Sequence, residues 1–280
     1  MTLPFHRLRA PVAAAHPDMI ETRFPTSAGA PAAAQPTLER ERLYRKQRLA
    51  AGFRMFARCG FDMGDAGHIT ARDPEWTDCF WLNPAGAHFG RITVSDLMLV
   101  SHSGEILQAP EHAPAKLNPA AFAIHSELHR ARPDVVAAAH AHSEHGMAWS
   151  SLGRLLDPIT QDAAAFYEDH ALFADFSGMV LETSEGAKIA GALGSQQAVI
   201  LQNHGLLTVG QTVESAVWRF ISLDSVCRVQ LLAEAAGAVR PMPPEVARLT
   251  ASQLGSEAAG QDAFEPYWSV VTAEEPDLFD

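Results

Sequence analysis

The chain has 280 residues, of which 47% are hydrophobic, and its 33 acidic side chains outnumber its 21 lysines and arginines to give a net charge of −12. This length and balance fit a globular protein with one large domain or two small ones. The negative charge argues against a nucleic-acid or anionic-membrane surface, and no apolar run reaches the roughly 20 residues that a bilayer span requires.

The first segment, residues 1–36, is rich in alanine and proline and has no sustained apolar period, so we predict a mobile arm. It carries proline and histidine where a secretory signal needs a continuous apolar core. The three cysteines, Cys59, Cys79 and Cys227, are far apart and odd in number, which indicates reduced intracellular thiols. We therefore expect a cytoplasmic protein.

The next elements are predicted as one helix followed by four short strands. Thr37 can cap the helix, and Glu39 and Glu41 then fall in its first turn, where acidic side chains are favourable. Short apolar runs separated by turn residues predict strands at 67–73, 79–86, 91–101 and 105–108.

Helices and strands alternate over the rest of the chain. Asn118 and Pro119 begin a helix that ends at Arg132. The further predicted elements are a strand at 134–142, a helix beginning near Ser143, a loop region at 158–173, a helix at 184–193, a strand at 197–210 and a helix at 212–237. This alternation predicts a single α/β domain over 37–240, with a central mixed sheet and helices on both faces.

Two histidines end the strand predicted at 134–142. Side chains two residues apart on a strand point to the same face, with Cα atoms about 6.5–7 Å apart, so His140 and His142 can reach one metal ion. The pair also fits a half-exposed strand end whose histidines hydrogen-bond to water or backbone. This spacing alone leaves both interpretations open.

A third histidine, His204, lies at a strand break between two apolar runs, and Gly205 gives the backbone freedom to turn there. Asn-His-Gly is also an ordinary turn composition, so a β-bulge or tight turn is the alternative. The two motifs together, in this order and with these flanks, are more specific than either alone.

At this point the sequence resembles the class II aldolase/adducin superfamily, from about Leu38 to Gly237. The similar stretches are GHIT at 67–70, NPAG at 83–86, NPAAFAIHSELHRARPD at 118–134, HAH at 140–142 and NHGLLTVG at 203–210. The resemblance implies a three-layer α/β/α domain with a largely antiparallel sheet. It also implies one divalent metal ion per subunit, held by His140, His142 and His204. Zinc is the family's usual ion, and imidazole ligands suit iron(II) and manganese as well.

The sequence departs from the family's phosphosugar aldolases at several positions of the expected site. Their metal-binding and acid/base glutamate corresponds to Ala121, and the hydroxyl side chains before it are replaced by Pro119 and Ala120. The family's Gly-Asn-Ile-Ser turn contains His68 here, and its Thr-Pro-Ser-Gly turn begins with Asn83. These losses argue against a phosphorylated sugar as substrate. His68 and Asn83 are expected to bind the substrate, His68 through a carboxylate.

Other histidines are candidates for the missing role. His125 lies one helical turn from Ala121. We expect it to act as an acid/base group or a fourth ligand, unless it is a buried helix histidine with a backbone partner. His145 lies about one turn beyond His142 and is expected to contact the substrate or to support a ligand.

The segment Tyr167-Glu168-Asp169-His170 lies in the loop region between the metal-binding elements. Such polar clusters are commonly solvated surface. Tyr167 and His170 are nevertheless candidates for proton transfer, because both side chains can exchange a proton with a substrate.

Three neutral imidazoles would leave the ion its double positive charge and at least one open position, which is the pattern of a catalytic site. Such an ion polarises a substrate carbonyl or hydroxyl and stabilises the enolate that carbon–carbon cleavage leaves. We therefore predict a metal-dependent lyase, of aldolase or decarboxylase type. Its substrate would be a non-phosphorylated hydroxy- or keto-carboxylate, aromatic acids included.

Two other functions are also compatible with the sequence. Three histidines can hold iron(II) with positions free for dioxygen, and some relatives with this pattern are oxygenases of aromatic acids. Adducin head domains share the fold and serve in assembly without catalysis.

The resemblance also implies a homotetramer with the site near a subunit boundary. The C-terminal extension at 241–280, with its stretch FEPYWSVV, packs either there or on its own domain.

Overall fold

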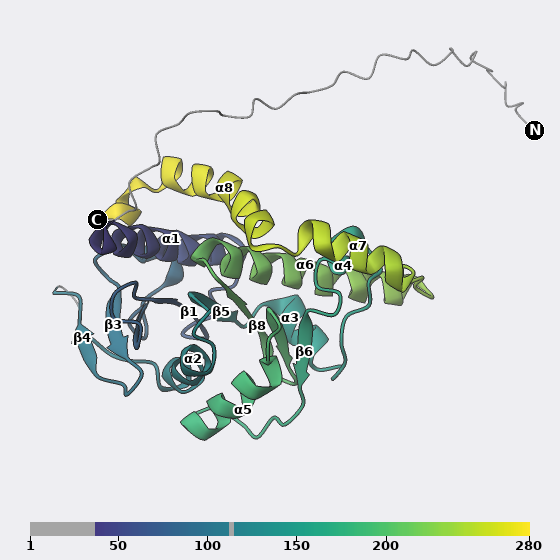
Figure 1. The fold of residues 1–280 in the computed structure, drawn as a ribbon, viewed down its shortest axis with the longest axis horizontal. Helices are drawn as coiled ribbons and strands as arrows, with labels where there is room; N and C mark the ends of the chain where they lie inside the picture. The colour runs from purple at the N-terminus through teal and green to yellow at the C-terminus, as the bar shows by residue number, and fades with distance from the viewer. Residues whose placement is uncertain (1–36, 112–114) are drawn as a thin grey trace, which may run out of the picture. The chain divides into compact units, whose positions relative to one another are not determined.

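A computed structural model describes residues 37–111 and 115–280 (Figure 1). The arm predicted at 1–36 lies outside the described residues. The helices are α1 (Leu38–Arg58), α2 (Pro119–Ala131), α3 (Glu144–Ser150), α4 (Gln161–Ala164), α5 (Thr183–Leu193), α6 (Val213–Ala236), α7 (Pro244–Leu254) and α8 (Glu257–Glu274), with the 3₁₀ turns η1 (Phe89–Arg91) and η2 (Pro276–Phe279). The strands are β1 (Gly67–Arg72), β2 (Cys79–Leu82), β3 (Met98–Ser101), β4 (Ile106–Gln108), β5 (Ala137–Ala141), β6 (His170–Phe173), β7 (Ala198–Leu201) and β8 (Gly205–Gly210).

The described strands form one 8-stranded sheet in the order β4-β3-β2-β1-β5-β8-β7-β6. Neighbouring strands pair antiparallel except β6 and β7, which are parallel. The predicted α/β fold with a mixed, largely antiparallel sheet is therefore confirmed. At the centre of the sheet, the register of β1 and β5 places His68 opposite His140.

Two helical layers cover the sheet. Helices α1, α3 and α6 pack on one face, and α2 and α5 pack on the other (Figure 1). Ile69 and Ala139 belong to the core beneath α1 and α6, whereas Ala138 belongs to the core beneath α2 and α5. Because strand side chains alternate between faces, His68 and His140 lie on the α2 face.

The C-terminal helices pack on the first layer. Helix α8 lies against α1 and α6 (Figure 1), and the guanidinium of Arg48 lies 3.9 Å from the centre of the Trp268 ring. The buried Arg54 pairs with Glu275 and Asp277 beyond the end of α8. These contacts join the extension to its own domain, and a contact with a neighbouring subunit stays a prediction. Among the described helices, none has the length and apolar character to cross a membrane.

Three stretches differ from their predicted elements. The strand predicted at 91–101 shortens to β3, because the backbone N–H and hydroxyl of Thr93 both donate to the Asp96 carboxylate in a turn that competes with strand pairing. The loop predicted at 158–173 contains α4, which Thr160 caps, and β6, which pairs with β7. The strand predicted at 197–210 is the hairpin β7–β8.

Candidate metal centre

His140 lies at the end of the buried strand β5, and one of its ring nitrogens is already engaged. Nδ1 lies 2.7 Å from the Leu206 carbonyl oxygen. Because a carbonyl only accepts, Nδ1 carries the proton and Nε2 has a free lone pair. His142 comes directly after the strand, and its ring centre lies 5.3 Å from that of His140. The two-residue spacing therefore brings both rings to one side of the sheet, as the sequence predicts.

The turn between β7 and β8 brings His204 to the same place. Leu201 pairs with Gly205 across the hairpin, and the His204 N–H donates to the Leu201 carbonyl over 3.0 Å. Asn203 has a φ of +60°, which asparagine tolerates better than most residues. Gly205 has a φ of +154°, which favours glycine. The residues on both sides of His204 thus allow a turn tight enough to aim its ring at β5.

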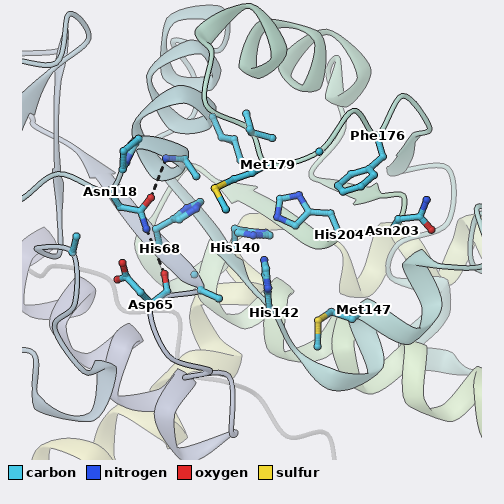
Figure 2. A pocket seen from close by; sticks show the side chains of 18 of the residues that line it. Asp65, His68, Asn118, His140, His142, Met147, Phe176, Met179, Asn203 and His204 are labelled. Atoms are coloured by element: carbon cyan, nitrogen blue, oxygen red, sulfur yellow. Dashed lines mark hydrogen bonds between the residues drawn. The ribbon is translucent and has the colours of Figure 1, made fainter.

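The three imidazoles converge. Each of His140, His142 and His204 offers one ring nitrogen, and these nitrogens lie within 4.8 Å of one another. Figure 2 shows the three rings directed toward a common space. The structure therefore brings together the residues that the sequence predicts as metal ligands.

The cluster lines a cavity of about 700 Å³ (Figure 2). The side chains that line it are mostly apolar, and Met147, Phe176, Met179 and Val180 are among them. Its polar lining residues are fewer and include Asp65, two residues before β1, and Lys116 and Asn118, which directly precede α2. A mostly apolar cavity of this size with a few polar groups is the usual form of a small-molecule site.

Burial keeps the cluster uncharged. It lowers the pKa of His140 well below the ordinary value and that of His204 to about 4, and the neighbouring imidazoles add to both effects. Burial also lowers the pKa of His142. Neutral imidazole is the form that binds metal ions, so the site offers three ready donors at neutral pH.

His125 does not reach the cavity. Its Nε2 lies 2.7 Å from Nδ1 of His68 and its Nδ1 lies 2.6 Å from the Thr70 hydroxyl, so both ring nitrogens are engaged. His68 lines the cavity in its place, with its ring centre 4.9 Å from that of His140. The side chain of Ala121 packs in an apolar cluster instead. In this structure His125 is the partner of His68 and Thr70 and does not lie at the histidine cluster. A role for it as an acid/base group or a fourth ligand stays a prediction.

Two expected substrate-binding residues also lie outside the cavity wall. Nδ1 of His145 lies 3.0 Å from the Asp224 carboxylate, which holds the imidazole against α6. The amide of Asn83 is buried and donates to the carbonyl of Pro84. The structure does not bring either side chain to the histidine cluster.

The candidates for proton transfer in the loop region are placed elsewhere as well. His170 accepts at Nε2 from the Leu156 N–H and donates from Nδ1 to the Phe166 carbonyl. It begins β6, whereas the end of that strand lies beside the hairpin turn. The ring of Tyr167 lies beneath Arg248, 5.9 Å from its guanidinium. The structure gives His170 a role in holding its own loop.

Several residues at or behind the cavity carry no signal in the sequence that would identify them. Phe176, Met179 and Val180 belong to a segment without regular structure, so no period marks them. Lys116 precedes the helix cap Asn118 by two residues and belongs to no motif. Thr70 stands within the GHIT stretch, and only the structure shows what its hydroxyl contacts.

The buried histidines predict that the metal-free protein loses stability below pH 6.5. Burial holds the pKa values of His125 and His129 well below 6.5, so the unfolded chain takes up protons that the folded chain does not. Above pH 6.5 these histidines are neutral in both states, so they do not lower the unfolding free energy there. It falls below that pH by up to about 1.4 kcal/mol per pH unit for each histidine. Urea titrations with chelator on both sides of pH 6.5 measure the slope, which His125→Gln should reduce; a flat profile contradicts this account.

Known proteins provide an independent comparison. A family profile described as class II aldolase and adducin N-terminal domain matches residues 47–231. A Streptomyces roseochromogenus subsp. oscitans protein described as 4-hydroxy-3-prenylphenylpyruvate oxygenase/4-hydroxy-3-prenylbenzoate synthase is 47% identical over 243 residues, which cover 86% of this chain and 87% of that protein. Decarboxylase NovR from Streptomyces niveus is 47% identical over 244 residues, covering 86% and 89%. A solved structure described as L-fuculose 1-phosphate aldolase from Glaciozyma antarctica PI12 has 46% identity and a TM-score of 0.82, and the match covers 88% of this chain and 95% of that one.

Proposed function

The chain belongs to the class II aldolase and adducin family, and from this premise we propose that it is a divalent-metal-dependent carbon–carbon lyase. One observation carries the proposal: His140, His142 and His204 offer ring nitrogens within 4.8 Å of one another at the wall of a cavity. The reaction breaks a carbon–carbon bond of a hydroxy- or keto-carboxylate and releases carbon dioxide or an aldehyde. The name of the 47% identical decarboxylase supports the first of these outcomes.

The donor set fits a divalent metal ion. His140 has its proton on Nδ1, because the Leu206 carbonyl accepts there, and its Nε2 is free to coordinate. The three imidazoles are neutral and include no carboxylate, so they would suit zinc, iron(II) or manganese. A bound ion would supply Lewis-acid stabilisation of negative charge on a substrate oxygen.

The other cavity residues would bind and shield the substrate. Lys116 is a cation at the cavity wall and can pair with a substrate carboxylate. Phe176 and Met179 can pack on an apolar or aromatic body and exclude water from it (Figure 2). Ala121 lacks the carboxylate of the phosphosugar aldolases, which supports a non-phosphorylated substrate.

Product analysis under anaerobic conditions tests the proposal. Protein stripped by chelator and reloaded with zinc, manganese or iron(II) is offered aromatic and aliphatic 3-keto acids and 4-hydroxy-2-keto acids, with L-fuculose 1-phosphate as the phosphorylated comparison. Loss of carbon dioxide from a 3-keto acid, or of an aldehyde from a 4-hydroxy-2-keto acid, leaves an enolate, which is the charge that a bound ion would stabilise. We expect metal-dependent release of carbon dioxide or aldehyde from an acid and none from the phosphosugar. Turnover of the phosphosugar alone would overturn the substrate assignment, and no cleavage with any metal would overturn the lyase.

A second function has one specific observation in its favour. The Streptomyces roseochromogenus relative is described as an oxygenase, and three histidines can hold iron(II) as well as zinc. If this chain shares that chemistry, the same acids are consumed only with iron(II) and dioxygen. Oxygen uptake in step with substrate loss distinguishes it from the lyase.

We also propose a homotetramer with the site near a subunit boundary, in the cytoplasm. The exposed face of α8, with Tyr267 and Val270 at 39% and 46% exposure, is a candidate contact. Light scattering of Tyr267→Glu against the unmodified chain tests this assembly, because a charge in the middle of an interface should shift the protein toward smaller species.

A further inference from the structure

The N-terminus of α2 faces the cavity, because Pro119 and Ala120 are among the lining residues. A helix N-terminus with free backbone N–H groups is a ready site for an anion. Pro119 has no N–H to offer. The side-chain oxygen of Asn118 accepts from the N–H groups of Ala120 and Ala121, over 2.9 and 3.2 Å. The cap therefore leaves no N–H at these positions with which α2 could hold an anion.

The turn at 84–87 engages its own donors in the same way. Ala85 also lines the cavity, and its N–H donates to the Lys116 carbonyl over 2.8 Å. The N–H of Gly86 donates to Oδ1 of Asp65 over 2.7 Å. Both N–H groups thus bind acceptors of the protein itself, so neither residue offers a backbone donor to a ligand in the cavity.

Asp65 keeps an acceptor for a ligand. Its side chain lines the cavity, and Figure 2 shows it beside Asn118, on the opposite side of the histidine cluster from Phe176. Among the described residues, Gly86 is the one hydrogen-bond donor to the carboxylate and uses Oδ1, so Oδ2 is open. A carboxylate can only accept a hydrogen bond. The group that binds to it must therefore bring the hydrogen.

Lys116 provides a cation at the same wall. Its carbonyl binds Ala85, and the next residue of that turn, Gly86, binds Asp65, so both charged residues are attached to one turn. The described residues include no ion pair between the two side chains, and both are exposed. Lys116 can then pair with one carboxylate of a ligand, whereas Asp65 favours a neutral donor over a second anion.

We propose that Asp65 is a specificity-determining residue, which accepts a hydrogen bond from a substrate hydroxyl while Lys116 binds the carboxylate of the same molecule. The substrate class narrows from hydroxy- or keto-carboxylates in general to acids that carry a hydroxyl. The inference rests on the proposed function, because it describes what the substrate of that reaction carries besides the bond that breaks. A methyl ether offers the same atoms as the hydroxyl without the donated hydrogen, and so isolates this contact.

A series of matched acids tests the assignment. The probes are straight-chain 2-keto acids whose hydroxyl moves stepwise along the chain, each paired with its methyl ether. They are titrated calorimetrically into the metal-free chain, in which metal-dependent turnover does not interfere. At one hydroxyl position we expect the acid to bind at least about fivefold more tightly than its ether, the gain from a hydrogen bond to an exposed carboxylate.

Asp65→Asn is the informative variant, because it keeps an oxygen for the Gly86 N–H but replaces Oδ2 by an amide nitrogen that donates. Both the hydroxyl and the ether oxygen can accept from this nitrogen, so the preference should fall to about twofold or less. Asp62→Asn is the matched control. Asp62 lies three residues earlier, lines a different cavity and has its carboxylate 3.2 Å from Nε2 of His88. It removes the same charge and should keep the preference.

The outcomes separate the inference from the proposed reaction. Equal binding of every hydroxyl acid and its ether overturns the inference, as does the absence of binding by all the probes. A preference that survives in Asp65→Asn, or that Asp62→Asn abolishes equally, also overturns it. A preference that depends on Asp65, in a protein that cleaves no acid with any metal, supports the inference and counts against the lyase alone.

Discussion

His140→Ala is expected to abolish stoichiometric metal binding and, with it, turnover. The side chain is 1% exposed and its ring is held by the Leu206 carbonyl, so the other two histidines cannot close over its position. Loss of an outer partner of a metal ligand already costs about 10–100-fold in affinity. Loss of the ligand itself should therefore cost more than about 100-fold in metal affinity. Metal analysis after mild purification, followed by zinc titration, measures the effect.

A matched control distinguishes loss of a metal ligand from general unfolding of the protein. His145 lies three residues beyond the motif but pairs with Asp224 and does not belong to the cluster. His145→Ala should therefore retain about one equivalent of metal, the single equivalent that one open three-histidine site holds. Circular dichroism should be unchanged in both variants. If His140→Ala keeps its metal, or both variants lose theirs, the three histidines are not the binding site.

The alternation of side chains along a strand explains why the pair His140 and His142 could be predicted from the sequence. A spacing of two on a strand is a local property, so the convergence of His140 and His142 needs no knowledge of the rest of the fold. The turn at His204 is also local, because Asn203 and Gly205 adopt positive φ values that their residue types tolerate. The meeting of the two motifs required the pairing of β5 with β8, which only the resemblance to a family supplied.

The buried contacts of His125 with His68 and Thr70 could not be predicted in the same way. Helix α2 shows which residues share a face, and so His125 was singled out, but its sequence does not fix how the helix is turned over β1. The structure turns it so that His125 contacts His68 and Thr70, and the space near the cluster belongs to His68. A rotation about a helix axis is a tertiary property, set by packing against the sheet and α5.

The close packing of α5 on α2 also predicts a large loss of unfolding free energy in Gly186→Ala, a substitution in α5. A Cβ at Gly186 would lie 1.9 Å from the carbonyl oxygen of Ala123 and 2.8 Å from its carbonyl carbon. Both atoms belong to the backbone of α2, so no side chain can rotate away and the two helices must separate. Overpacking of a core commonly costs about 1–3 kcal/mol, and a clash with backbone on this scale should cost at least about 3 kcal/mol of unfolding free energy.

Gly191 is the matched control in the same helix, because a Cβ there meets no atom within 4 Å. Gly191→Ala should stabilise the protein by about 0.5–1 kcal/mol, since alanine favours a helix over glycine. Urea unfolding of both variants measures the difference. Separation of the helices would also draw His125 away from β1, so Gly186→Ala should disturb its contact with His68. The ¹⁵N NMR signals of histidine-labelled protein report this contact at urea concentrations where the chain is still folded. Equal stability of the two variants would contradict the close contact of α2 and α5, and with it the packing that turns His125 toward His68.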